Sequence, residues 1–89
     1  MDYSLLIVDE KRWHKDCTRI PQNDLQEINS RIQSLGMQPW PDGIDVKKLH
    51  NCIVADFRLR VRDYRVLFNK NNDRQEIRLL RVLHRSKLY

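Results

Sequence analysis

The stretch from Asp56 to Phe68, DFRLRVRDYRVLF, decides the fold. Along its first half, apolar and arginine side chains alternate, which is the period-two pattern of a strand with one buried and one charged face. The apolar positions are Phe57, Leu59 and Val61, and the charged positions are Arg58, Arg60 and Arg62. Asp63 marks a tight turn, after which Tyr64 to Phe68 returns as a second strand. Because the apolar side chains face a core, the pleat is expected to send the three arginines to the opposite face.

The segments outside this hairpin predict two more strands and two helices. Tyr3 to Val8 (YSLLIV) is an aliphatic strand, and Asp9 after it is a typical helix N-cap. From Glu10 to about Arg19, and again from Pro21 to Leu35, apolar residues recur with helical spacing. These apolar positions are Trp13, Cys17 and Ile20 in the first helix, and Leu25, Ile28, Ile32 and Leu35 in the second. Glu76 to Leu83 (EIRLLRVL) is predicted as the last strand.

Breaker residues mark the connections between these elements. Gly36 is a typical residue just beyond a helix C-terminus. Gln38 to Ile44 (QPWPDGI) predicts a surface connection, in which Trp40 covers one edge of the core. Asn69 to Asp73 (NKNND) has the composition of a turn before the last strand.

The predicted order β-α-α-β-β-β indicates an α+β fold, with a helical hairpin packed on one face of a small antiparallel sheet. Eighty-nine residues make a single domain, residues 1–89, with an expected radius of gyration of about 12 Å. A chain this small buries only about 60–65% of its unfolded surface, so its core is thin. A functional site is therefore expected in a surface groove, and an enzyme that encloses a large cofactor is disfavoured.

Charge is distributed unevenly along the chain. Residues 1–43 carry 5 basic and 7 acidic groups, a net charge of −2, whereas residues 44–89 carry 12 and 5, a net charge of +7. A strongly basic half favours a polyanionic partner, most simply nucleic acid. Asp56 and Asp63 are the only carboxylates that bracket the arginine-rich strand in sequence, so we expect internal salt bridges to neutralise it incompletely.

Cysteine usage and the N-terminal sequence point to a reducing, cytoplasmic location. Cys17 and Cys52 follow neither a disulfide framework nor the spacing of a zinc site. The chain begins with a short apolar run that lacks a basic region before it and a cleavage pattern after it. No apolar stretch approaches the ~18 residues that a transmembrane helix needs.

Three segments carry a family pattern: Val46 to Leu49 (VKKL), Asp56 to Phe68, and Ile77 to Tyr89 (IRLLRVLHRSKLY). Together with a helical hairpin and central proline at Asp9 to Gly36, this combination resembles the RelE/ParE superfamily of bacterial type II toxin–antitoxin toxins, in its RelE-like mRNA interferase branch. The resemblance implies a microbial RNase-like fold and a ribosome-associated endoribonuclease that cuts translated mRNA. It also implies a cognate antitoxin that holds the toxin inactive. The chain departs from the pattern at Arg62, where many relatives have glycine.

The same resemblance implies site residues. Arg58 and Arg60 match two basic strand positions around the scissile phosphate, and Arg65 resembles the phosphate-stabilising arginine. Arg85 and Tyr89 occupy the places of a C-terminal arginine and of a tyrosine on which a base stacks. The further basic positions expected to bind RNA are Lys47, Lys48, Arg62, Arg81 and Lys87.

The implied reaction is attack of a ribose 2′-hydroxyl on the adjacent phosphate, which requires no metal and no cofactor. It needs a base, charge stabilisation at phosphorus and an acid. Near neutral pH, deprotonating an arginine costs about 7.5–9 kcal/mol and a lysine about 4.6 kcal/mol, whereas a histidine costs almost nothing. His84, which precedes the C-terminal arginine in many relatives, is therefore the leading candidate for proton transfer. The strand arginines are better interpreted as phosphate clamps.

Two other functions remain open from the sequence. A ParE-like toxin has the same fold but inhibits DNA gyrase without catalysis, and a basic adaptor would only bind nucleic acid or protein. The ending His84-Arg85-x-x-x-Tyr89 favours phosphate chemistry, because a gyrase inhibitor needs no acid and stacking aromatic. The expected partners are mRNA, the ribosomal A site and an acidic or amphipathic antitoxin segment that folds on binding. No membrane and no small-molecule cofactor are expected.

Overall fold

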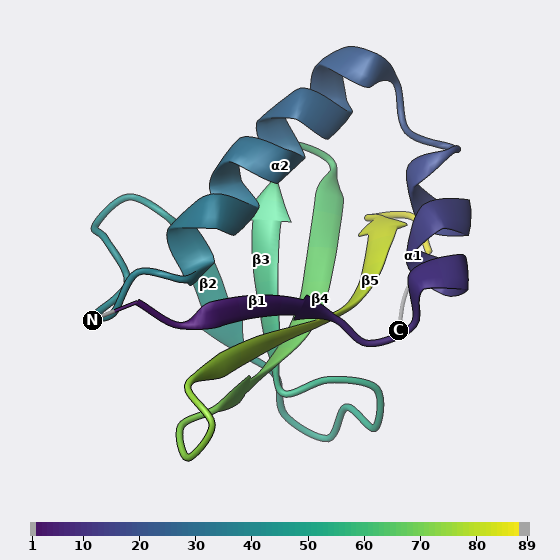
Figure 1. The fold of residues 1–89 in the computed structure, drawn as a ribbon. Coiled ribbons are helices and arrows are strands. Elements are labelled where there is room, and N and C mark those ends of the chain that lie inside the picture. Colours follow the sequence, from purple (N-terminus) through teal and green to yellow (C-terminus); the bar gives the residue numbers. More distant parts are fainter. Residues whose placement is uncertain (1, 88–89) are drawn as a thin grey trace.

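A computed structural model describes residues 2–87, which form two helices and a five-stranded sheet. The elements in chain order are β1 (Ser4–Ile7), α1 (Glu10–Cys17), α2 (Gln22–Leu35), β2 (Asp45–Lys48), β3 (Phe57–Val61), β4 (Tyr64–Asn71) and β5 (Glu76–His84). Helix α2 crosses one face of the sheet, and α1 lies beside the last part of β5 (Figure 1). The radius of gyration is 12.2 Å, the compactness expected for this length. Neither helix in the described part of the chain has the length and apolar character needed to cross a membrane.

The sheet confirms the predicted α+β class but differs from the prediction in two details. The strand order is β1-β5-β4-β3-β2, and β1 runs parallel to β5 while the other pairs are antiparallel, so the sheet is mixed. The second difference is β2, a strand that the sequence did not predict. Only Val46 in β2 is apolar and partly buried, so the period-two signal is too short to see. Charged side chains of this kind are typical of an edge strand.

The two helices begin where their sequences predicted. The Asp9 carboxylate accepts a hydrogen bond from the backbone N–H of Arg12 at 3.1 Å, which confirms the N-cap of α1. Helix α2 follows Pro21 and places its apolar stripe on the sheet. The buried core joins both helices to the sheet through Trp13, Ile20, Ile28, Ile32, Leu35, Leu59, Val61, Val66, Phe68, Ile77, Leu79 and Val82. Burial of this continuous apolar cluster is the main force that holds the helices on one face.

Gly36 and Trp40 secure the end of α2. Gly36 follows the last residue of α2 as predicted and has an ordinary helical φ of −73°, so glycine is not needed there for a left-handed backbone. It is required instead by close approach, because a Cβ at this position would lie 2.9 Å from the Tyr3 carbonyl oxygen. Trp40 meets the rings of Phe57 and Phe68 edge-on, with centroids 5.5 and 5.9 Å apart, and its indole N–H donates to the Leu35 carbonyl at 2.9 Å. The prediction that Trp40 covers an edge of the core is therefore confirmed.

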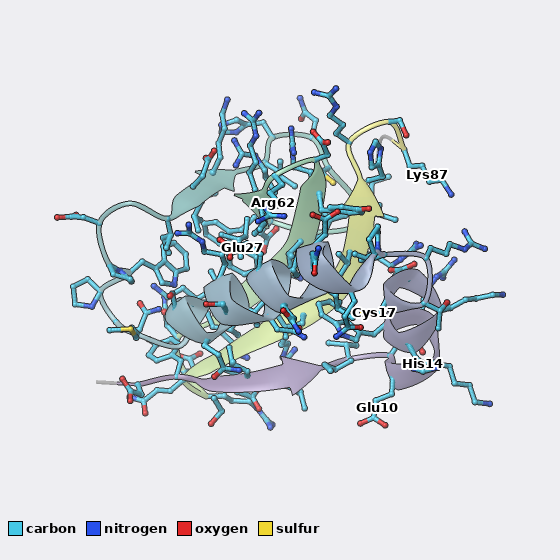
Figure 2. The ribbon with its side chains drawn as sticks, turned by 90° about the horizontal axis from the view of Figure 1, so that it is seen from above. Glu10, His14, Cys17, Glu27, Arg62 and Lys87 are labelled. Carbon is cyan, nitrogen blue, oxygen red and sulfur yellow. The ribbon has the colours of Figure 1, made fainter. Side chains whose placement is uncertain are left out.

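Arg62 does not share a face with Arg58 and Arg60, so that prediction is wrong. It lies in the turn between β3 and β4 with a φ of 53°, the left-handed region that glycine adopts most easily. Since a turn residue leaves the pleat, its guanidinium turns to the helix side and its Nη1 reaches Asp24 of α2 at 2.9 Å. Figure 2 shows Arg62 on the side of the sheet where Glu27 of α2 lies.

The turn between β4 and β5 also comes later than predicted. Strand β4 continues to Asn71, so the turn occupies residues 72–75. Asn69 stays in the strand, where its side-chain oxygen accepts the backbone N–H of Asp56 at 2.6 Å. Within the β4–β5 pair the register shifts at Leu67/Phe68, because Leu67 pairs with Arg81 while Phe68 pairs with Leu79. The skipped residue, Leu80, is a β-bulge in β5.

Candidate nucleic-acid interface

Four cationic side chains share the face of the sheet that is turned away from α2. Strands β2 and β3 pair Lys47 with Arg58, and strands β3 and β4 pair Arg60 with Arg65. Directly opposite residues lie on the same face of a sheet. Because the neighbouring residue Leu59 is fully buried in the helix-side core, the pleat directs these four side chains outward. We call Lys47, Arg58, Arg60 and Arg65 the basic face.

Arg60 and Arg65 form a pair of like charges across β3 and β4. Arg60 is exposed, and no ion pair in residues 2–87 involves it. Arg65 is half-buried, and its Nη1 donates to the Tyr64 carbonyl at 3.3 Å. Like charges directly opposite each other destabilise a sheet. A bound phosphate between the two guanidinium groups would relieve this repulsion.

Arg58 is held by a carboxylate that the sequence did not reveal. Its Nη1 donates to the Asp45 carboxylate at 2.9 Å and to the Asp45 carbonyl at 3.0 Å. The hydrogen bond from Arg58 lowers the pKa of Asp45 below its usual value and outweighs the opposing effect of burial. The positive charges of Arg58, Arg60 and Arg65 lower this pKa further. Asp45 belongs to the unpredicted strand β2, so its proximity to Arg58 has no local sequence signal. Among the ion pairs of residues 2–87 that involve Lys47, Arg58 or Arg60, Asp45 supplies the carboxylate, so the basic face keeps an excess of positive charge there.

His84 lies on the opposite face from these cations. Val61 pairs with Tyr64 and Tyr64 pairs with His84, so the three side chains share the side of the buried Val61. The rings of Tyr64 and His84 meet edge-on with centroids 5.3 Å apart. The bulge at Leu80 causes this placement, since one extra residue reverses which side chains of β5 face outward. The structure therefore does not bring His84 together with the predicted phosphate-clamping arginines.

The hydrogen bonds of His84 also bear on proton transfer. Its Nδ1 accepts the backbone N–H of Ser86 at 3.2 Å and lies 2.9 Å from the Ser86 hydroxyl oxygen. A neutral imidazole whose Nδ1 accepts a hydrogen bond carries its proton on Nε2. In this arrangement the ring can donate a proton or a hydrogen bond from Nε2, but its basic lone pair is already engaged.

A shallow cavity of about 320 Å³ lies beside His84, between the α1–α2 connection and the end of β5. Arg19, Tyr64 and Lys87 contribute to its lining, and Figure 2 shows Lys87 at the periphery of the molecule. Arg81 also lines it, but both oxygens of the buried Asp16 carboxylate hold Arg81, at 2.7 and 2.9 Å. Lys87 therefore belongs to a region separate from the basic face. Arg81 pairs with Leu67, which pairs with Arg58, so its register lies on the outward face, but its guanidinium group is held by Asp16.

The remaining predicted residues are placed as follows. Lys48 pairs with Phe57, which puts it on the helix side of β2. Arg85 lies at the end of β5, where its Nε is 3.6 Å from the Asp63 carboxylate and both side chains are exposed. Tyr89 lies outside the described residues. Of the predicted set, the structure gathers Lys47, Arg58, Arg60 and Arg65 on one face and places Lys48, Arg62, His84 and Lys87 elsewhere. Arg81 shares the outward register of Arg58 but is held by Asp16. Within residues 2–87, no cluster of three or more His, Cys, Asp or Glu side chains could hold a metal ion.

The fold agrees with comparisons to solved structures. The chain is similar to the archaeal RelE–RelB complex from Pyrococcus horikoshii, with 26% identity, a TM-score of 0.75, and coverage of 99% of this chain and 100% of the other. It also matches the RelB–RelE antitoxin–toxin complex from Methanococcus jannaschii, with 26% identity, a TM-score of 0.70 and 91% of each chain covered. The toxin–antitoxin complex RelBE2 from Mycobacterium tuberculosis shares the fold, with 20% identity, a TM-score of 0.75, and coverage of 94% and 99%.

The sequence comparisons give a family as well as a fold. A comparison with curated proteins finds no match. The family model of the ParE toxin of the type II toxin–antitoxin system parDE matches residues 11–89, which is most of the chain. Together with the structural likenesses, this match shows that the chain belongs to the ParE toxin family, within the RelE/ParE superfamily of type II toxin–antitoxin toxins.

Proposed function

We propose that this toxin acts on RNA through its basic face and inhibits translation by cutting translated mRNA on the ribosome. The observation that carries the proposal is the outward pair of Arg60 and Arg65 on neighbouring strands, flanked by Lys47 and Arg58. Arg58 and Arg60 are alternate residues of β3, and such residues are about 6.6–7 Å apart, which is close to the spacing of successive phosphates. Cationic side chains at this spacing match the repeated phosphates of a polynucleotide backbone better than they match an isolated anion.

The proposed cleavage is metal-independent attack of a ribose 2′-hydroxyl on the adjacent phosphate, which breaks the bond from phosphorus to the 5′-oxygen and gives a 2′,3′-cyclic phosphate and a 5′-hydroxyl. Water takes the 2′-hydroxyl proton and protonates the leaving 5′-oxygen. Guanidinium groups of the basic face would bind the phosphate oxygens and stabilise the charge that develops on them. Since His84 lies on the other face, the protein contributes mainly positioning and electrostatic stabilisation. We therefore expect slow cleavage by the free protein, and fast cleavage where the ribosome aligns the 2′-hydroxyl in line with the phosphate.

The test is mapping of mRNA 5′ ends in cells after brief induction. The wild type is compared with Arg60→Gln and Arg65→Gln, and with Arg74→Gln as a charge-matched control from the exposed β4–β5 turn. In-frame cuts within translated messages, lost in the two basic-face variants and kept in the control, support the proposal. Cuts that are equally frequent in all four proteins would overturn it.

A ParE-like inhibitor of DNA gyrase is the second candidate. Two observations favour it: the matching family model is that of a ParE toxin, and the imidazole of His84 is placed away from the basic face with its Nδ1 lone pair engaged. A binding toxin needs no such base. Intact messages together with broken chromosomes after induction would support this function over mRNA cleavage.

A cognate antitoxin is the proposed partner. The solved structures from Pyrococcus horikoshii and Methanococcus jannaschii are toxin–antitoxin complexes. By charge complementarity, an acidic antitoxin segment would fold over the basic face and block it. Co-expression tests this model: an antitoxin that restores growth should protect Arg60 and Arg65 from a guanidine-modifying reagent. Rescue of growth with both arginines still fully reactive would contradict occlusion.

A further inference from the structure

We infer that Asp45 sets the affinity and salt dependence of polyanion binding, because its carboxylate occupies the position at Arg58 that a ligand phosphate would otherwise take. This inference rests on the proposed role of the basic face. It gives Asp45 the role of an affinity-determining residue that competes with the ligand, without any part in the chemistry of cleavage.

The geometry places Asp45 within the basic face itself. It is the first residue of the edge strand β2, directly opposite Arg60 in the register. Its carboxylate extends diagonally to Nη1 of Arg58 at 2.9 Å, and its backbone carbonyl accepts from the same nitrogen at 3.0 Å. Two oxygens of a single residue therefore hold one guanidinium nitrogen, so this nitrogen is not available to a ligand phosphate while the ion pair is closed.

The exposed fractions of the Arg58 and Asp45 side chains indicate which of the two an approaching ligand meets first. The side chain of Arg58 is 14% exposed, whereas that of Asp45 is 52% exposed. An approaching phosphate therefore encounters the carboxylate before it can reach the guanidinium group of Arg58. It must displace Asp45 or bind beside it, and each alternative costs affinity.

The charge of Asp45 persists under physiological conditions. The hydrogen bond from Arg58 and the positive charges of Arg58, Arg60 and Arg65 keep the pKa of Asp45 below its usual value of 3.8. The carboxylate is therefore ionised at neutral pH and repels a polyanion. With Asp45 in place, the exposed Arg60 and Lys47 meet phosphates first, and Arg58 contributes only when the ion pair opens.

The test is fluorescence anisotropy with a labelled single-stranded oligouridine at several salt concentrations. Asp45→Asn keeps a hydrogen-bond acceptor for Arg58 but removes the charge, and it is expected to bind about three- to tenfold more tightly at low salt. One additional phosphate contact should steepen the dependence of log K on log salt by about 0.7. The advantage of the variant should then shrink about threefold between about 50 and about 200 mM salt.

Matched variants separate this effect from a change in net charge. Asp42→Asn removes an exposed carboxylate from the preceding loop and should leave the affinity and the salt slope unchanged. Asp45→Glu keeps the charge and should retain a slope close to that of the wild type. Arg58→Gln removes a cation of the basic face and should weaken binding, and it should abolish the gain in affinity of Asp45→Asn over the wild type. Thermal melts establish that each variant is folded.

The outcomes distinguish this inference from the proposed function. The proposed role of Asp45 is overturned if Asp45→Asn binds the oligouridine no more tightly than Asp42→Asn does. It is also overturned if the gain in affinity persists when Arg58→Gln is added. Wild-type and Arg60→Gln proteins that bind the oligouridine equally overturn the basic face as the RNA site. Tight binding by Asp45→Asn alone, with no detectable wild-type binding, supports the inference while it contradicts RNA as the wild-type ligand.

Discussion

Asp16 and Arg81, 65 residues apart in sequence, form a two-pronged ion pair that joins α1 to β5, with Nε–Oδ2 and Nη2–Oδ1 distances of 2.7 and 2.9 Å. The same carboxylate accepts the backbone N–H of Val82 at 3.1 Å. Strand β1 ends at Ile7 and pairs with β5 as far as Leu79, so no strand within residues 2–87 neighbours this edge of β5 beyond Leu79. Asp16 thus supplies the acceptor that a further strand residue would have provided. This structural role accounts for Arg81 without RNA.

The first prediction concerns the strength of this ion pair. Asp16 is only 8% exposed, so Asp16→Ala would leave a partly buried guanidinium group and the Val82 N–H without their acceptor. We expect a loss of about 3 kcal/mol in the free energy of unfolding. Urea denaturation measures this loss, with the exposed Asp42→Ala as the control. A double variant that also carries Arg81→Ala should lose less than the two single losses combined, and strict additivity would show that the two residues are not coupled.

The second prediction is the pH dependence of that stability. Burial acts to raise the pKa of Asp16, but the hydrogen bonds from Arg81 and Val82 and the charges of Arg81 and Arg12 outweigh it, so the pKa lies below 3.8. The folded state therefore binds this proton less readily than the unfolded state. The resulting stability is present above the unfolded-state pKa and is lost as pH falls through the folded-state pKa. Urea denaturation of the wild type and of Asp16→Asn from neutral pH to about pH 3 should show a smaller acid loss in the variant. Parallel curves would contradict the assignment.

The third prediction concerns the left-handed backbone of Arg62. Replacement by glycine removes backbone strain but also removes the ion pair to Asp24, in which the Arg62 side chain is 56% exposed and therefore contributes little. These effects nearly cancel, so Arg62→Gly should stay within about 1 kcal/mol of the wild type. Arg62→Val loses the same ion pair and puts a β-branched residue at positive φ, which should cost about 1–2 kcal/mol more than Arg62→Gly. Thermal melts of the two variants decide this, and equal stability would argue against a strained turn.

Local sequence patterns predicted most of the fold, because both helices and four of the strands have a periodicity that a short window can show. Strand β2 was missed since Val46 is its only apolar residue. The turn residue Arg62 was assigned to the outer face because a period-two pattern does not show where the pleat ends. Each of these errors concerns a short feature whose conformation depends on a neighbouring segment.

The candidate site was harder to predict because it depends on register. If side chains alternated regularly along β5 from the buried Ile77 and Leu79, His84 would point outward, toward the arginines. The bulge at Leu80 reverses this phase, so the buried Val82 and His84 share the helix side. The Asp45–Arg58 contact likewise depends on the pairing of β2 with β3, which no local pattern reports. The sequence identified which cations are present, whereas strand pairing determines which of them act together.

The last prediction separates the two faces of the sheet by function. Arg60 is exposed on the basic face, whereas His84 is on the other side with Nδ1 engaged by Ser86. If cleavage depends on phosphate stabilisation by the basic face, Arg60→Gln should slow single-turnover cleavage of mRNA on programmed ribosomes by about a hundredfold. His84→Gln should change the rate by less than about threefold, since general acid or base catalysis, typically worth 10²–10⁴-fold, is not assigned to it. A loss in His84→Gln as large as that in Arg60→Gln would show that the imidazole reaches the scissile phosphate, and would restore proton transfer by His84 to the mechanism.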